Sequence, residues 1–145
     1  MIVLTILEIK GDLFNAPDGF YFAYCVSSDF ALGAGIAKQF RDKFNMKEKL
    51  MSKYNKTDIG NIGKAILIVN CFNLVTKERY YNKPTYASVQ MTLLDMKRQC
   101  IEKHITKLAM PHIAAGLDGL EWNTVLSILC GVFNDTNVII NIYSL

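Results

Sequence analysis

The sequence predicts an α/β fold in which helices cover both faces of a mostly parallel β-sheet. Apolar and β-branched runs typical of strands alternate along the chain with segments whose apolar residues recur every three or four positions, as in helices. Two of these runs, residues 20–26 and 108–110, are apolar almost throughout, as expected for strands buried on both faces. The 145 residues are 51% hydrophobic, so they suit a single domain, residues 1–145, with a sizeable core.

The chain begins with two expected strands joined by a loop. Residues 2–9 are rich in β-branched and apolar side chains and form the first strand, which stops at Gly11. Residues 13–19 contain asparagine, proline, aspartate and glycine and are expected to form a loop. Residues 20–26 form the second strand, which ends at Ser27.

A loop of small residues then opens a helix over residues 38–44. Gly33 and Gly35 stand just before Ile36 and Phe40, whose helical spacing continues along this segment. The pattern completes neither a Gly-x-Gly-x-x-Gly fingerprint nor a Gly-Lys-Ser/Thr phosphate loop. Small residues here suit either close approach of a ligand to the backbone or close packing of a helix on a strand.

The middle of the chain is expected to add a helix and a pair of strand-like runs. Residues 46–54 form a short charged helix, and residues 55–63 form a polar connection. Residues 64–70 and 72–76 are either two strands joined by a turn at Asn70-Cys71 or one bent strand. The pattern leaves both alternatives open.

A polar, aromatic loop, residues 77–83, leads into the longest predicted helix. Pro84 stands where a first-turn proline is favoured. From Tyr86 onward, apolar residues recur at spacings of three and four, and the helix is expected to end at His104, whose type suits a helix C-terminus.

The stretch from residue 107 to residue 122 combines a short strand with a loop and a helix start. The apolar run 108–110 is followed by Pro111 and by a loop of small residues, 114–119. Such a loop lets backbone N–H groups approach a phosphate, although an ordinary strand-to-helix turn has the same composition. A helix over residues 122–133 and a strand over residues 137–143 complete the chain.

Composition excludes several classes of function. The net charge is only +3 and the lysines are scattered, whereas a protein that binds nucleic acid through phosphate contacts has a denser basic face. There is no apolar run of the ~20 residues that cross a bilayer and no signal-peptide pattern, so we expect a cytoplasmic, intracellular protein without membrane contact. The four separated cysteines are expected to be reduced core residues, and two histidines do not make a zinc site.

Several stretches together resemble the macrodomain family, the α/β/α fold that binds ADP-ribose. They cover nearly the whole chain in order, and they are Lys10-Gly11-Asp12-Leu13-Phe14, Gly33-Ala34-Gly35-Ile36-Ala37, Leu74-Val75-Thr76-Lys77, Lys83-Pro84-Thr85-Tyr86, Met110-Pro111, Gly116-Leu117-Asp118, Trp122 and Ile142-Tyr143-Ser144-Leu145. The chain is most similar to the terminal ADP-ribose protein glycohydrolase branch, and it also resembles macrodomain antitoxins that remove ADP-ribose from DNA bases.

The resemblance implies a three-layer α/β/α architecture with a mixed, mostly parallel sheet, and a set of ligand-binding residues. Asp12 would accept a hydrogen bond from the adenine amino group, although an aspartate after a glycine also commonly caps a turn. The loop over the distal ribose would include Gly33, Gly35 and Ile36, with Ser27 just upstream on the strand end. The pyrophosphate cradle would run from Ala114 through Ala115 to Gly116, and Leu13 and Leu117 would also belong to the ligand-binding set. Tyr143 would pack near the adenine or simply belong to the core.

The sequence departs from the family pattern in two places. Ala114 and Ala115 stand where relatives often carry glycine followed by cysteine, threonine or serine, and their methyl groups would narrow the cradle. His112 stands where relatives often have a basic residue or leucine.

In the loop before the long helix, Tyr80 and Tyr81 either stack on a base or pack into the core.

The implied catalytic residues are Lys77 and Asp118. Each follows a predicted strand, at the edge of an α/β sheet where ligands bind. The resemblance implies a lysine nucleophile that attacks the C1″ carbon of ADP-ribose and an aspartate that acts as acid and base. The plain alternatives are a solvated loop lysine and an aspartate that caps a turn or helix.

We therefore expect a hydrolase that removes ADP-ribose linked at C1″ from a glutamate side chain, a nucleobase, or a small ester such as O-acetyl-ADP-ribose or ADP-ribose 1″-phosphate. The alternatives are a non-catalytic module that binds ADP-ribose and a structural α/β domain. The expected partners are ADP-ribose or an ADP-ribosylated protein, nucleic acid or small molecule. No cofactor or metal is required by the residues, and a monomer is expected.

Overall fold

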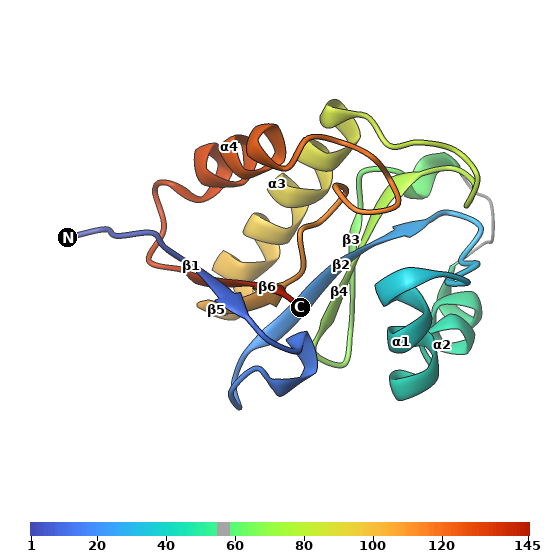
Figure 1. Ribbon diagram of the computed structural model, residues 1–145, viewed down its shortest axis with the longest axis horizontal. Coiled ribbons are helices and arrows are strands. Elements are labelled where there is room, and N and C mark those ends of the chain that lie inside the picture. Colours follow the sequence, from blue (N-terminus) through green and yellow to red (C-terminus); the bar gives the residue numbers. More distant parts are fainter. Residues whose placement is uncertain (55–58) are drawn as a thin grey trace.

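Six strands form one mixed sheet among the residues that the computed structural model describes, 1–54 and 59–145 (Figure 1). They are β1 (Thr5–Lys10), β2 (Tyr21–Ser27), β3 (Ala65–Ile68), β4 (Cys71–Lys77), β5 (Lys107–Met110) and β6 (Ile139–Ser144). Their order across the sheet is β1-β6-β5-β2-β4-β3, and each neighbouring pair is parallel except β3 and β4. The prediction of a mixed, mostly parallel sheet is confirmed.

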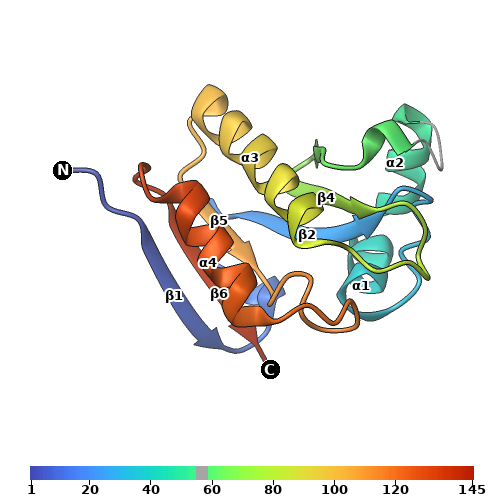
Figure 2. The same cartoon turned by 90° about the horizontal axis from the view of Figure 1, so that it is seen from above.

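Helices lie on both faces of this sheet and make the fold three-layered, as predicted (Figures 1 and 2). One face packs against α1 (Gly35–Phe44) and α2 (Met46–Lys53), and the other packs against α3 (Tyr86–Lys103) and α4 (Trp122–Phe133). Short 3-10 turns at Leu13–Asn15 and Ile59–Asn61 complete the described elements.

The alternation of side chains along the central strands explains why both faces are covered. On β2, Phe22, Tyr24 and Val26 belong to the core beneath α1 and α2, whereas Ala23 and Cys25 face the core beneath α3 and α4. Because successive strand residues point to opposite faces, an apolar run without polar gaps needs a layer on each side.

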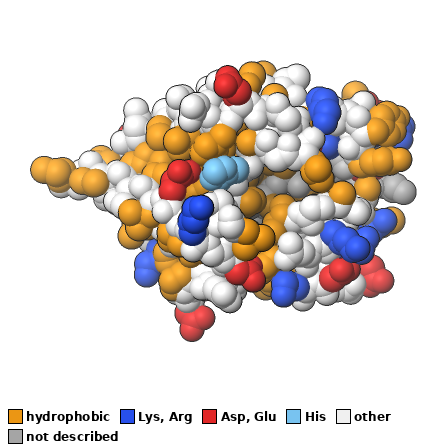
Figure 3. All heavy atoms as spheres, viewed as in Figure 1, with side chains coloured by type: hydrophobic (Ala, Val, Ile, Leu, Met, Phe, Trp, Pro, Cys, Tyr) orange, Lys and Arg blue, Asp and Glu red, His pale blue; other side chains and the backbone are white. Residues whose placement is uncertain are grey.

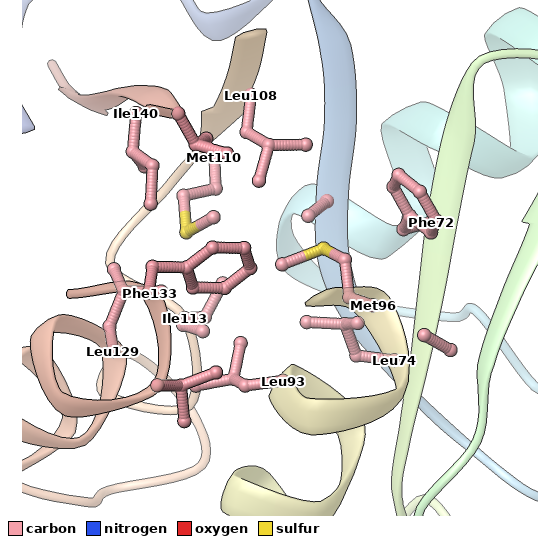
Figure 4. Close-up of a cluster of buried hydrophobic side chains, with 14 of the residues drawn as sticks. Phe72, Leu74, Leu93, Met96, Leu108, Met110, Ile113, Leu129, Phe133 and Ile140 are labelled. Carbon is pink, nitrogen blue, oxygen red and sulfur yellow. The ribbon is translucent and has the colours of Figure 1, made fainter. Parts of the chain in front are cut away.

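The core beneath α3 and α4 is built from large apolar side chains. Phe133 of α4 lies among Leu93 and Met96 of α3 and Met110 of β5 (Figure 4). These four side chains are fully buried. This packing fixes β5 beneath the helices, so the loop that follows Met110 starts from a rigid support.

The segments predicted at residues 64–70 and 72–76 form two strands, not one bent strand. β3 and β4 are antiparallel, with Ile68 opposite Cys71, so the turn is made by Val69 and Asn70. Val69 has a φ of 56° and is exposed, as turn residues often are. The turn therefore lies one residue earlier than the predicted position at Asn70 and Cys71.

The prediction for the start of the long helix was wrong at Pro84. Thr85 is the N-cap, and its side chain and that of Ser88 form a reciprocal capping box, so Pro84 lies before the helix rather than in its first turn. At the other end, His104 is the C-cap with a φ of 57°. The helix therefore ends at the predicted residue.

Three further predictions concern membrane helices, surface charge and the connection at residues 55–63. No helix among them is long and apolar enough to cross a membrane. Basic and acidic side chains are scattered over the face drawn in Figure 3 rather than gathered by sign. Of the predicted polar connection 55–63, residues 55–58 lie outside the described residues, and residues 59–61 form a 3-10 turn.

Candidate functional site

A cleft of about 840 Å³ lies at the carboxyl edge of the sheet. The ends of β2, β4 and β6 reach it through Ser27, Lys77 and Tyr143, and the loop after β5 reaches it through Pro111. This edge is where parallel α/β sheets bind ligands, and the volume is in the range of small-molecule sites, roughly 300–1,000 Å³. The cleft lies at the edge of the sheet where the sequence predicts ligand binding.

One wall of the cleft is the loop that opens α1. Gly35 has a φ of 59°, a conformation that glycine adopts without a steric penalty. A Cβ atom at Gly35 would lie 3.3 Å from Cδ1 of Leu117 on the opposite wall. The N-cap residue, Ala34, makes no side-chain hydrogen bond, so no capping side chain occupies this end of the helix.

The opposite wall is the loop after β5, residues 114–118. Ala114 is buried and has a φ of 60°, which is unusual for a residue with a Cβ atom. Its carbonyl accepts the N–H of Leu120 at 2.9 Å, and Lys83 Nζ donates to the carbonyl of Leu117 at 2.8 Å. These bonds tie the loop back on itself and to the loop after β4.

Lys77 and Asp118 meet between these walls. The Nζ atom of Lys77 lies 2.7 Å from Oδ1 of Asp118, and the two side chains are only 13% and 17% exposed. Lys77 is therefore not a solvated loop lysine. The N-cap position of α4 is occupied by Glu121, so Asp118 does not cap that helix.

Cys25 of β2 also lines the cleft. Burial raises the pKa of Cys25 to about 12, and the negative charge of Asp118 acts in the same direction. A thiol held protonated is a poor nucleophile. Cys25 is therefore not the nucleophile of this cleft.

A buried carboxylate that the sequence reasoning missed lies just behind the cleft. Asp29 is 6% exposed, and its oxygens accept hydrogen bonds from the Ser27 hydroxyl and from the backbone N–H groups of Ala31 and Tyr80. The available signal was an acidic residue placed directly between the end of a buried strand and a predicted ligand loop.

The aromatic residues at the rim are exposed. Tyr80 and Tyr81 are 66% and 65% exposed, line the cleft, and contact each other edge to face with centroids 5.3 Å apart. The alternative that they pack into the core is wrong. Tyr143 is buried but reaches the cleft, and its hydroxyl accepts a hydrogen bond from Asn141 Nδ2 at 3.4 Å.

Three of the predicted ligand-binding residues do not line the cleft in this structure. Asp12 caps a 3-10 turn, with its Oδ1 accepting the N–H of Phe14 at 3.0 Å, and Leu13 is buried in the core beside α1. Ala115 is half-buried and its side chain is not among the lining groups. Seven others line it together with the catalytic pair, namely Ser27, Gly33, Gly35, Ile36, Ala114, Gly116 and Leu117.

His112 also lines the cleft, in a cluster that the sequence did not reveal. Its ring stacks parallel to Trp122 at 4.4 Å, and its Nε2 lies 3.5 Å from the Glu8 carboxylate, which also accepts the indole N–H of Trp122. No group of three or more His, Cys, Asp or Glu residues in the described ranges could hold a metal ion.

Comparison with known proteins decides the family. The chain is 37% identical to the ADP-ribose glycohydrolase OARD1 of Homo sapiens over 144 residues, which is 97% of this chain and 91% of that protein. The chain belongs to the macrodomain family. No family profile matches it. The predicted enzyme class, a hydrolase, is confirmed by such relatives, among them an ADP-ribose 1″-phosphate phosphatase of Neosartorya fischeri, 34% identical over 57% of this chain and 34% of that protein.

Solved structures agree with this assignment. The macrodomain of Mycobacterium tuberculosis DarG has a TM-score of 0.82 and 27% identity over 97% of this chain and 98% of that chain. Thermosipho africanus DarTG in complex with ADP-ribose has a TM-score of 0.75 and 19% identity over 96% of this chain and 41% of that chain, a likeness of fold alone. The macrodomain architecture therefore holds over nearly the whole chain.

Proposed function

We propose that the protein releases ADP-ribose from groups linked at its C1″ carbon, with Lys77 as nucleophile and Asp118 as acid and base. The single observation that carries this proposal is the 2.7 Å contact between Lys77 Nζ and Asp118 Oδ1 inside the cleft. A partly buried amine and carboxylate in direct contact can exchange a proton while both face a ligand. The names of the relatives support the choice of ADP-ribose.

The cleft walls suit the parts of such a ligand. The distal ribose would lie against Gly33, Gly35 and Ile36, where the backbone is accessible, with Ser27 beneath it. The pyrophosphate would lie between the uncapped start of α1 and the loop of Ala114, Ala115, Gly116 and Leu117, since a helix N-terminus favours an anion.

The adenine would lie at the β6 end of the cleft. Tyr143 would pack against the base, and Asp12 would accept a hydrogen bond from its amino group. A carboxylate has acceptor capacity beyond the single bond that Asp12 makes to Phe14, so the capping role and the adenine role are compatible.

The reaction can be written with these two side chains alone. Asp118 takes a proton from Lys77, and the free amine attacks C1″ as the bond from C1″ to the leaving group breaks. Asp118 then returns the proton to the leaving atom. Water, deprotonated by Asp118, displaces the lysine from C1″ and ADP-ribose departs. Asp118 passes the proton from water to the released amine, so both side chains return to their starting charges.

A panel of substrates tests the proposal. Wild-type protein is incubated with glutamate-linked ADP-ribosyl protein, ADP-ribosylated DNA, O-acetyl-ADP-ribose and ADP-ribose 1″-phosphate, and released product is measured. Asp118→Ala should abolish release while ADP-ribose binding largely persists, and Lys77→Ala should lose most activity. A covalent adduct on Lys77 should be detected by mass spectrometry, more readily in an Asp118 variant.

The surface pair Lys97–Asp135 provides a matched control, because its atoms are also 2.7 Å apart but lie outside the cleft. Lys97→Ala and Asp135→Ala should leave release unchanged. Full turnover by Lys77→Ala would replace the covalent route with a water activated by Asp118. Tight binding of ADP-ribose without release from any substrate would identify a binding module instead.

A further inference from the structure

The backbone of the segment after β4 is held by residues that follow β2. The N–H of Ser28 donates to the carbonyl of Lys77 at 2.8 Å, and the N–H of Asp29 donates to the carbonyl of Glu78 at 3.1 Å. The Asp29 side chain completes the connection, because its Oδ2 accepts the N–H of Tyr80 at 2.9 Å. Asp29 therefore binds this segment twice, as a donor through its backbone N–H and as an acceptor through its carboxylate.

The pairing of β2 with β4 is irregular just where it reaches Lys77. The pairing of β2 with β4 is regular as far as Val26 opposite Val75, and then shifts so that Ser27 lies opposite Lys77. Such an irregularity adds a residue to one strand and re-aims the side chains beside it. The bonds made beyond the shift therefore act together with the Ser27–Lys77 pairing to set the orientation of Lys77.

We propose that Asp29 is a positioning residue that holds Lys77 against Asp118. Its buried carboxylate joins the segment 77–80 to the loop that leads into α1, so the nucleophile and the ribose-facing wall are fixed to one group. This inference rests on the catalytic role proposed for Lys77. Asp29 does not line the cleft, so it acts through its neighbours rather than on the substrate.

The chemistry of the group explains why an aspartate suits this position. The Ser27 hydroxyl and the N–H groups of Ala31 and Tyr80 all donate to its oxygens. A carboxylate accepts at both oxygens, whereas an asparagine amide accepts at one and presents N–H groups at the other. Asp29→Asn keeps the shape of the side chain and must turn an N–H toward one of these donors.

The test compares Asp29→Asn with Asp42→Asn, the same chemical change at an exposed carboxylate on α1 outside the cleft. We measure kcat, affinity for ADP-ribose by calorimetry, and the Lys77–Asp118 distance in a crystal structure. A misplacement of about 1 Å costs on the order of a hundredfold in rate, so Asp29→Asn should lower kcat by ~10- to 100-fold. Affinity should fall by roughly threefold or less, because positioning a nucleophile acts mainly on the chemical step.

A second pair of variants applies if Asp29→Asn does not fold. Tyr80→Pro removes the N–H that Oδ2 accepts, and Tyr80→Ala removes the ring but keeps that N–H. The proposal requires a lower kcat for the proline variant than for the alanine variant. Equal rates would overturn it.

The outcomes separate this inference from the proposed function. An unchanged kcat in Asp29→Asn, or equal losses of kcat and affinity, would overturn the positioning role. Asp29 would then only stabilise the fold. If wild-type protein shows no turnover, the proposed function fails, and the crystal structure still decides: Lys77 and Asp118 should separate beyond hydrogen-bonding distance in Asp29→Asn and remain together in Asp42→Asn. A pair that remains at 2.7 Å in Asp29→Asn would overturn the positioning role.

Discussion

Gly35 faces Leu117 across the cleft, and a methyl group added at Gly35 would press on the Leu117 side chain. A Cβ atom at Gly35 would lie 3.3 Å from Cδ1 of Leu117, which is 73% exposed and free to shift. The φ of 59° adds a backbone penalty for any residue other than glycine. A side chain at position 35 would therefore displace the Leu117 side chain on the opposite wall of the cleft.

Gly35→Ala should both destabilise the protein and weaken ADP-ribose binding. The backbone conformation alone costs about 1–2 kcal/mol for an L-residue. Gly33→Ala is the comparison, because a Cβ atom there meets only Ala31 O at 4.0 Å and its φ is not positive. Urea unfolding should show a loss of stability for Gly35→Ala alone. Equal stability of the two variants would contradict the strain argument.

Ala114→Gly should leave stability nearly unchanged although it truncates a buried side chain. Relief of the left-handed conformation returns about 1–2 kcal/mol. Loss of the buried methyl costs about 0.8 kcal/mol, and the added freedom of the unfolded chain costs up to about 1 kcal/mol. Ala109→Gly on β5, equally buried but without a positive φ, should lose about 1–2 kcal/mol. Matched denaturation curves that show equal losses would count against strain at Ala114.

The order and type of the elements could be predicted because periodicity is a local property. Their ends could not, since distant partners decide them. The first strand begins at Thr5 rather than at residue 2, because pairing with the end of the chain starts there. The Thr5 N–H donates to the carbonyl of Val138. The start of α3 shifted from Pro84 because the Thr85–Ser88 capping box has no periodic signal.

The sequence predicts the edge of the sheet at which the candidate site lies. It does not predict which side chains contact each other there. Lys77 and Asp118 follow strands, and the rule for parallel sheets places both at one edge. Their 2.7 Å contact and their burial require the fold. Asp29 was missed because its partner Tyr80 is 51 residues away, and no local pattern indicates that pairing.

Native Cys25 should resist alkylation although it lines the cleft. Burial raises its pKa to about 12 from a usual value of 9.0, and only the thiolate reacts with iodoacetamide. At pH 8 mass spectrometry should find Cys25 unlabelled in the native protein and labelled in urea. The labelling rate of native protein should rise about tenfold per pH unit. Rapid labelling at pH 8 would mean that the thiol is not held protonated.

The same raised pKa predicts alkaline destabilisation. Above pH 9 the thiol ionises in the unfolded chain but stays protonated in the folded one, so the unfolded state is stabilised relative to the folded state as pH rises toward 12. The stabilising contribution is therefore complete below pH 9 and declines above it. Cys25→Ala should show a smaller loss of unfolding free energy between pH 9 and pH 11 than wild type.

The Lys77–Asp118 pair should be energetically coupled in folding, independently of catalysis. Either single variant, Lys77→Met or Asp118→Ala, leaves one charge about 85% covered without its partner, which costs more than removing both. A double-mutant cycle in urea should give a coupling of about 1–3 kcal/mol. The pair Lys97–Asp135 should give a smaller value in the same cycle, since the Asp135 side chain is 63% exposed and water screens it. Additive losses at Lys77 and Asp118 would show that the two charges do not interact in solution.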